Sequence, residues 1–194
     1  QGRMEFGPRA LGSRSIIANP ADVNMQKKLN LKIKFRESFR PFAPIVMDEC
    51  SNDWFKIKNK NEYMLLTYFF RDEKRFDDSM KEGLKKIDHV YSKVPAVTHV
   101  DYSARAQIIK KNFNCKIYSL IEQFYKKTDI PMLINTSFNI RGEPIINSPS
   151  DALRCFMNTD MDALVLENLI LIKKDQDKNL LLDENYKKDS LYGD

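Results

Sequence analysis

The sequence contains few of the residues that build cross-linked or membrane-spanning proteins. Among 194 residues there are only three cysteines (Cys50, Cys115 and Cys155), which are scattered and never form a CxxC pair. Such a set argues against a disulfide framework and a cysteine zinc site, and it predicts a reducing, cytoplasmic environment. No apolar run approaches the ~20 residues that a membrane-spanning helix needs. We therefore expect no membrane partner.

The opening residues do not predict a secretory leader, and the first residue is Gln1 instead of methionine. A Gly/Arg-rich stretch follows at once, which is unusual for a natural start. We therefore expect the chain to be a piece of a longer protein. Its length fits a single domain with a trailing segment.

The net charge of +5 is modest, because lysines and acidic residues alternate along most of the chain. The arginines are more informative, since many stand beside Gly, Pro, Ser or Asn in loop-like contexts. These are Arg3, Arg9, Arg14, Arg36, Arg40, Arg105 and Arg141. The planar guanidinium group suits bidentate recognition of anions, so this distribution predicts an anion pocket lined by loops.

The apolar pattern predicts strands and helices in an irregular order. Residues 19–22 (Asn-Pro-Ala-Asp) are typical of a helix start, and we expect that helix to reach about Ile33 with Val23, Leu29 and Ile33 buried. Further helices are predicted around residues 117–125 and after a capping box at Ser148. Strands are expected at residues 45–47, 63–70, 95–100 and 132–134, with a hairpin at 163–166 and 169–172 and a charged, solvated excursion at 72–93. Without a regular βαβ period, this order favours a mixed α/β fold with helices packed on a mixed sheet.

The segment from Asn135 to Pro144 is the strongest candidate for chemistry. A short apolar strand is expected to stop there, and Asn135, Ser137, Asn139 and Arg141 follow in a polar loop. Polar loops at strand ends are common ligand sites, where amides and hydroxyls can donate to phosphate oxygens. A turn whose Asn and Ser side chains cap their own backbone is the alternative.

A second candidate lies at residues 34–42. If this stretch is extended, Lys34, Arg36 and Ser38 share one face. Two neighbouring cations are unfavourable unless an anion lies between them, which predicts an anion site. The alternative is an exposed basic rim beyond a helix end.

A third candidate combines His99, Asp101 and Arg105. His99 and Asp101 would project from the same side of a strand and could ligate a metal, although a hydrogen-bonded structural pair is the favoured interpretation. Arg105, expected at a helix start, is the better anion ligand. The Gly/Arg-rich segment at residues 2–15 has no Walker lysine and is therefore not a P-loop.

Four stretches carry a family resemblance, in the order GRMEFGPRALGSRSI, KFRESFRPFAP, PAVTHVDYSARAQ and IPMLINTSFNIRGEPI. Together they resemble the C-terminal domain of the O-carbamoyltransferases of nodulation-factor and antibiotic biosynthesis, up to about Lys173. The resemblance implies a YrdC-like fold, a twisted mixed sheet with packed helices. It also implies that the domain condenses carbamoyl phosphate with ATP to give carbamoyl adenylate and pyrophosphate.

The same resemblance implies the site residues. YrdC-like domains use a Lys-x-Arg and a Ser-x-Asn pair, which match Lys34 with Arg36 and Ser137 with Asn139; Arg105 completes the catalytic set. The residues implied to contact substrate or nucleotide are Arg40, Asn135, Arg141, Thr98 and His99. Mg²⁺ is expected with ATP, but no protein ligand for a metal is predicted in this chain.

A preceding actin/Hsp70-like transferase domain, carrying its own metal and using a hydroxyl acceptor, is implied as the partner. Residues 1–18 would link to it, residues 19–173 would form the adenylating domain and residues 174–194 a tail. The chain departs from the pattern at Ser13, Phe35, Ser38 and Tyr102, where many relatives are expected to have Asn, His, Pro and Gly. Two alternatives remain: an RNA-binding module, against which the scattered charge argues, and a docking domain without chemistry of its own.

Overall fold

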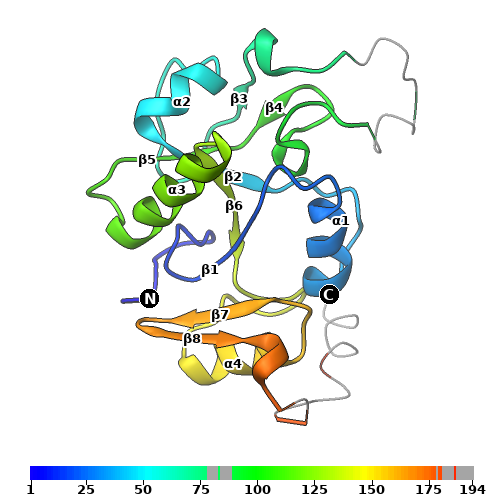
Figure 1. Cartoon of the computed structure of the whole chain (residues 1–194), viewed down its shortest axis with the longest axis vertical. Coiled ribbons are helices and arrows are strands. Elements are labelled where there is room, and N and C mark those ends of the chain that lie inside the picture. The colour runs from blue at the N-terminus through cyan, green and yellow to red at the C-terminus, as the bar shows by residue number, and fades with distance from the viewer. Residues whose placement is uncertain (78–82, 84–88, 178, 181–185, 187–194) are drawn as a thin grey trace. The chain divides into compact units, whose positions relative to one another are not determined.

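The computed structural model describes residues 1–77, 83, 89–177, 179–180 and 186, and these residues are shown in Figure 1. The chain folds into two compact units, each built from separate stretches. Unit 1 contains Gln1–Ser15, Lys27–Arg40 and Ser137–Asp194, and unit 2 contains Ile16–Gln26 and Pro41–Thr136. The predicted division at residues 18 and 173 stays a prediction.

The main sheet belongs to unit 2 and has four strands in the order β1-β6-β2-β5. Their bounds are Ser15–Ala18 for β1, Ala43–Met47 for β2, Gln107–Ile109 for β5 and Met132–Ser137 for β6. Strand β2 is parallel to β5 and antiparallel to β6. The sheet is therefore mixed, and the predicted mixed α/β class is confirmed.

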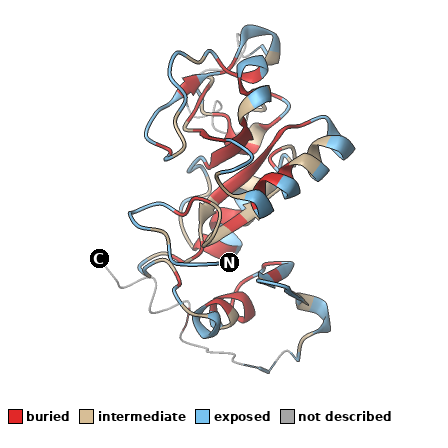
Figure 2. Ribbon diagram, turned by 90° about the vertical axis from the view of Figure 1, so that its left-hand side faces the viewer, coloured by how far each residue is buried: buried red, intermediate tan, exposed pale blue. Residues whose placement is uncertain are grey.

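Helix α3 (Cys115–Thr128) packs on this sheet and forms the core of unit 2. Its N-cap Asn114 accepts a hydrogen bond from the Ile117 amide, and Asp129 ends it in a left-handed conformation. The helix is one-sided, with a buried stripe toward the strands and an exposed outer face (Figure 2). The buried core cluster comprises Ile45, Met47, Ile109, Ile117, Tyr118, Ile121 and Leu133. The amphipathic helix predicted from residues 117–125 is thus confirmed.

Unit 2 also contains short elements that differ from the predicted strands. The only regular strand within 63–70 is β3 (Tyr68–Phe69), which pairs with β4 (Ser103–Ala104). Residues 95–100, predicted as a strand, instead begin with a 3₁₀ turn, η4 (Pro95–Val97). Pro95 at the first position of that turn has no N–H to donate to a sheet, which favours the turn. Helix α2 spans Asp48–Trp54, and η2 spans Asp72–Lys74.

The predicted excursion at residues 72–93 lies partly outside the described residues, because 78–82 and 84–88 are not described. Its described ends are joined by an isolated bridge between Arg75 and Ser92. No helix in the described part of the chain is both long enough and apolar enough to cross a bilayer.

Unit 1 contains helix α4 (Pro149–Met157) and the hairpin of β7 (Ala163–Leu166) and β8 (Leu169–Ile172), followed by η5 (Lys173–Asp175). Ser148 and Asp151 form the predicted capping box, and Pro149 occupies the first turn of the helix. The hairpin is antiparallel, with Leu164 opposite Leu171. Both sequence predictions are confirmed.

The first helix begins later than its sequence pattern indicates. α1 spans Met25–Leu29 and continues as a π-helical turn, η1 (Asn30–Lys34). The side chains of Asn19 and Asp22 accept hydrogen bonds from the amides of Ala21 and Asn24. The residues expected to cap the helix therefore stabilise two local turns that precede it. Consequently Val23 is 60% exposed, contrary to the prediction, whereas Leu29 and Ile33 are buried as expected.

Candidate functional site

Lys34 ends the π-helical turn η1, and the backbone changes direction immediately after it. Phe35 adopts a left-handed conformation with φ of 48°, and the Arg36 amide donates back to the Asn30 carbonyl at 3.0 Å. The stretch is therefore coiled, and the predicted extended face that carries Lys34, Arg36 and Ser38 is wrong. The Lys34 side chain is buried in this coil, since the residue is only 4% exposed.

The buried ammonium of Lys34 lies among oxygen atoms of the segment 137–139. Nζ donates to Asn139 Oδ1 at 2.7 Å and to the Asn139 carbonyl at 2.9 Å. It also contacts the Ser137 carbonyl and lies 3.5 Å from Ser137 Oγ. The structure thus brings together Lys34 of the Lys-x-Arg pair and both members of the Ser-x-Asn pair.

Asn139 is oriented by groups on both sides of its amide. Its Oδ1 accepts from Ser137 Oγ at 2.9 Å as well as from Lys34, and its Nδ2 donates to the Glu143 carbonyl at 2.7 Å. Ser137 is the last residue of β6, so the strand continues through a region that was predicted as loop from Asn135 onward. The strand fixes Ser137, and the following turn fixes Asn139.

Asn30 positions Arg36 from inside η1 and was not among the predicted site residues. Its side chain is fully buried, and its Oδ1 accepts from Arg36 Nε at 2.7 Å. The Nδ2 group of Asn30 donates to the carbonyls of Ser38 and Arg40 at 3.0 and 2.9 Å. The sequence signal for Asn30 was its position between Leu29 and Ile33, which were expected to be buried. A polar side chain beside such residues is itself often buried, and a buried amide needs hydrogen-bond partners.

Glu37 is the acidic residue that two arginines of this region share. Arg40 Nε lies 2.9 Å from Glu37 Oε2, and Arg141 lies 4.0 Å from Oε1. The pKa of Glu37 is lowered, first by its own backbone N–H and then, against some burial, by Arg40, Arg141 and Arg36. Glu37 therefore interacts with three arginines of unit 1, in a region that also contains Lys34.

Burial and neighbouring positive charges lower the pKa values of Lys34 and Arg36, the two cations of the Lys-x-Arg pair. Burial, and then the charge of Arg36, lower the pKa of Lys34 to about 7, with Cys155 opposing. Burial, and then Arg40, lower the pKa of Arg36 to about 10, with Glu37 opposing. A bound anion would favour the charged form of both groups.

Asn135 belongs to unit 2, where its side chain forms a buried contact with Gln107. Asn135 Nδ2 donates to Gln107 Oε1 at 2.7 Å, and the two residues are 1% and 0% exposed. The contact links β6 to β5 inside the sheet. The predicted role of Asn135 in ligand binding stays a prediction.

Thr98, His99 and Arg105 also lie in unit 2, in turns instead of the predicted strand and helix. Thr98 Oγ1 donates to the Val94 carbonyl at 2.9 Å, and His99 Nδ1 lies 3.0 Å from Ser103 Oγ. Burial, partly offset by Asp101, lowers the pKa of His99. Arg105 falls between β4 and β5, so its expected place at a helix start is wrong. The structure joins Thr98 and His99 to residues nearby in the chain, and the binding roles of Thr98, His99 and Arg105 stay predictions.

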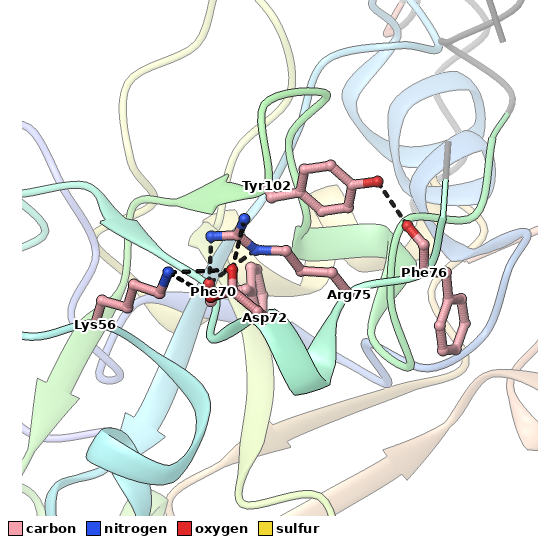
Figure 3. A network of polar contacts seen from close by, with 6 residues as sticks. All are labelled: Lys56, Phe70, Asp72, Arg75, Phe76 and Tyr102. Atoms are coloured by element: carbon pink, nitrogen blue, oxygen red, sulfur yellow. Dashed lines mark hydrogen bonds and ion pairs between the residues drawn. The ribbon is translucent and has the colours of Figure 1, made fainter. Parts of the chain in front are cut away.

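A second polar network of unit 2 is shown in Figure 3 and holds the ends of its short elements together. Asp72 pairs with Lys56 at 2.8 Å and with Arg75 at 2.9 Å. The Arg75 guanidinium donates to the Phe70 carbonyl and lies 5.2 Å from the centre of the Tyr102 ring. Each cation has a protein partner, so this network has the character of a structural clamp.

The Gly/Arg-rich segment at residues 2–15 folds around Glu5. The Glu5 carboxylate accepts from the amides of Leu11, Ser13 and Arg14 at 2.9 to 3.2 Å. Arg14 in turn donates to the main-chain oxygens of Gln1 and Gly2. The segment is therefore a loop organised by the carboxylate of Glu5.

Within the described residues, no three His, Cys, Asp or Glu side chains gather into a cluster that could hold a metal ion. The donors of unit 1 are instead cations, amides and hydroxyls, whose chemistry suits phosphate-type anions. This combination defines a mixed α/β protein with a basic candidate anion site.

Sequence comparison assigns the chain to a particular family. A family model described as carbamoyltransferase C-terminus matches residues 1–173, and the chain belongs to this family. It is 51% identical over 180 residues to the uncharacterized protein sll1178 of Synechocystis, covering 91% of this chain and 29% of that protein. It is 38% identical over 177 residues to nodulation protein NolNO of Sinorhizobium fredii, covering 90% and 24%. Nodulation protein NolO of Bradyrhizobium diazoefficiens is 37% identical over 175 residues, with 90% and 29% covered. The chain thus spans less than a third of the length of these relatives.

Proposed function

We propose that this chain is the part of a carbamoyltransferase that binds carbamoyl phosphate and ATP and forms carbamoyl adenylate. The observation that carries the proposal is the buried Lys34 ammonium, which lies against Ser137 and Asn139 in a region rich in arginine. Membership of the carbamoyltransferase C-terminus family supports the carbamoyl group as the transferred unit.

The proposed reaction balances with one water molecule. Water releases inorganic phosphate from carbamoyl phosphate and leaves carbamate, whose oxygen attacks the α-phosphorus of ATP. The new bond joins that oxygen to phosphorus, and the bond to pyrophosphate breaks. No side-chain nucleophile is needed, so catalysis consists of positioning and of neutralising negative charge.

Each site residue has a proposed task that suits its chemistry. Lys34 and Arg36 neutralise the phosphate groups, and Ser137 and Asn139 orient the substrate through hydrogen bonds. Arg40 and Arg141 add positive charge at the nucleotide. Their ion pairs with Glu37 would be replaced there by ion pairs with a phosphate group. The residues of unit 2 with proposed substrate or nucleotide contacts are Arg105, Asn135, Thr98 and His99.

Mg²⁺ is proposed as the companion of ATP. The described residues supply no ready carboxylate cluster, so the ion would be held chiefly by the nucleotide phosphates, which Mg²⁺ commonly uses as ligands. It would reduce the charge of the triphosphate. The remaining neutralisation falls to the lysine and arginines of unit 1.

The complete protein is proposed to contain a preceding transferase domain of the actin/Hsp70 type. That domain would pass the carbamoyl group from the adenylate to a hydroxyl acceptor, in the cytoplasm. The support is the family assignment, together with the 24–29% of their length that the matched relatives share with this chain.

Pyrophosphate release by the complete protein tests the proposal. Release should require both ATP and carbamoyl phosphate, and Lys34→Met should lower kcat/KM by about 10²-fold, as loss of a preorganised electrostatic group does. The matched control is Lys126→Met, which removes an exposed lysine paired with Glu122 on α3. The proposal fails if release ignores carbamoyl phosphate or if the two variants behave alike. RNA binding that falls steeply with salt, in place of this activity, would favour the RNA-binding alternative.

A further inference from the structure

Tyr186 lies beyond the residues that match the family, yet it is buried in unit 1. The residue is 3% exposed, and its hydroxyl donates to Glu143 Oε2 at 2.9 Å. The Arg154 guanidinium lies 5.1 Å from the centre of its ring. Helix α4 therefore supports the ring, while the hydroxyl reaches the turn that follows β6.

The residue that Tyr186 contacts also touches the candidate site. The Glu143 carbonyl accepts from Asn139 Nδ2 at 2.7 Å, and Asn139 Oδ1 accepts from Lys34 Nζ at 2.7 Å. These contacts form a continuous path from Tyr186 through Glu143 and Asn139 to Lys34. All four residues belong to unit 1.

The Glu143 carbonyl decides which end of the Asn139 amide faces Lys34. With Nδ2 held by that carbonyl, Oδ1 must point toward the ammonium, which donates only. If the amide turned over, its NH₂ group would face the ammonium and its oxygen would face the Glu143 carbonyl. Both new contacts are repulsive, so the position of Glu143 selects the productive orientation.

Cys155 is a titratable neighbour of Tyr186 among the described residues, and it adds no anion near neutral pH. Cys155 is 1% exposed, interacts with Tyr186, and has the pKa of its thiol raised to about 11, chiefly by burial. It therefore stays neutral. The Tyr186–Glu143 hydrogen bond thus joins a neutral hydroxyl to a partly buried carboxylate, and hydrogen bonds to a charged group are the stronger kind.

We propose that Tyr186 is a positioning residue that, through Glu143, holds Asn139 in the orientation that serves Lys34. This inference rests on the proposed function for its catalytic consequence, but its structural core concerns Lys34 and Asn139 alone. Tyr186 would then tune a site whose other members lie within residues 1–173.

The first test compares two variants of the complete protein that each lose one buried hydroxyl. Tyr186→Phe should lower kcat/KM for carbamoyl phosphate about tenfold, because small misplacements of positioning groups are costly. Tyr118→Phe is the matched control, since Tyr118 is 5% exposed and donates to Glu49 in unit 2. It should keep wild-type kcat/KM even if its melting temperature falls.

Rescue distinguishes positioning from general stability. Glu143→Gln retains an oxygen that accepts from Tyr186 and should stay near wild type. Glu143→Ala should resemble Tyr186→Phe, and the double variant should lose no more than either single variant. Losses that simply multiply in the double variant would overturn the proposed path.

A readout without substrate separates this inference from the proposed function. Competitive labelling with acetic anhydride, followed by peptide mass spectrometry, gives the pH at which Lys34 becomes reactive. In Tyr186→Phe that midpoint should move to lower pH, because a turned Asn139 amide stabilises the ammonium less. Arg36 also acts on Lys34 and is unchanged, and Cys155 loses its contact with the Tyr186 hydroxyl but stays a neutral thiol, because that loss can only raise its pKa further. If the midpoint shifts in Tyr186→Phe but the wild-type protein releases no pyrophosphate, the proposed function is refuted and the positioning role is kept. An unchanged midpoint together with unchanged kcat/KM would refute the positioning role alone.

Discussion

Arg36 Nε lies 2.7 Å from Asn30 Oδ1, and this contact fixes the arginine through a buried residue six positions earlier in the chain. The other end of the Asn30 amide holds the carbonyls of Ser38 and Arg40. One side chain therefore sets both the direction of Arg36 and the path of the loop that carries Arg40. The geometry of the basic region depends on an uncharged residue.

Removing the Asn30 amide should harm both stability and binding. Asn30→Ala leaves two carbonyls and one guanidinium without this partner, and we expect the free energy of unfolding to fall by roughly 2–3 kcal/mol. Affinity for carbamoyl phosphate should also fall, because Arg36 loses its direction. Asn30→Asp keeps an acceptor for Arg36 but loses the donors, so its stability should fall with less effect on affinity. Urea denaturation and titration calorimetry measure the two effects; equal affinities for Ala and Asp would contradict the role of Oδ1.

Lys34 should make stability depend on pH in a predictable direction. Its pKa is about 7 in the folded protein and 10.5 ordinarily, so between these values the unfolded chain binds more protons. Stability should therefore rise with pH in that window, by up to about 1.4 kcal/mol per pH unit, and Lys34→Met should remove this contribution.

Urea denaturation between pH 7 and 8.5 measures this slope. The window stays below the range in which Cys155, with its pKa raised to about 11, contributes with the opposite sign. Lys126→Met serves again as the control and should keep the wild-type slope. A wild-type stability that does not rise relative to Lys34→Met would show that the folded pKa of Lys34 is not depressed.

Tyr102 offers a test of backbone strain against side-chain contacts. It has φ of 62°, a left-handed conformation that glycine adopts readily, and relatives were expected to have Gly here. Tyr102→Gly should gain about 1 kcal/mol from relieved strain. It should lose the hydroxyl bond to the Phe76 carbonyl, the contact with Arg75 and the edge-to-face pair with Tyr91, each of about 0.5–1.5 kcal/mol.

The net expectation for Tyr102→Gly is therefore a lower melting temperature. Tyr102→Phe keeps the rings and the strain but loses the hydroxyl, so it should lie between wild type and Gly. A Gly variant that is more stable than wild type would mean that strain outweighs the clamp shown in Figure 3.

Local signals made parts of the fold predictable from the sequence. The capping box at Ser148 and the amphipathic spacing of α3 depend on neighbours a few residues away, and both predictions are confirmed. The strand predicted at 95–100 failed because apolar composition alone cannot separate a buried 3₁₀ turn from a strand. The early helix start failed because Asn19 and Asp22 can cap their own turns as readily as a helix.

In the candidate site, too, some residues could be predicted from the sequence and others could not. Its charged and amide residues could be named from their types and spacing, and the structure brings Lys34, Ser137 and Asn139 together. The residues that orient them could not be predicted, since Asn30 and Glu143 act through contacts with carbonyls and amides elsewhere in the fold. Asn30 gave only the weak signal of a polar residue between Leu29 and Ile33, and a Glu in a turn, such as Glu143, has no distinctive pattern in the sequence.

The Lys34 ammonium takes part of its coordination from the main-chain oxygens of Ser137 and Asn139. A side-chain substitution cannot remove a main-chain carbonyl. Two of the four oxygen atoms around the ammonium are therefore retained in any point mutant in which the turn after β6 keeps its shape. Substitutions at positions 137 and 139 should therefore leave these two main-chain contacts to the cation in place. The position of this positive charge in unit 1 is thus set by the main chain as well as by side chains.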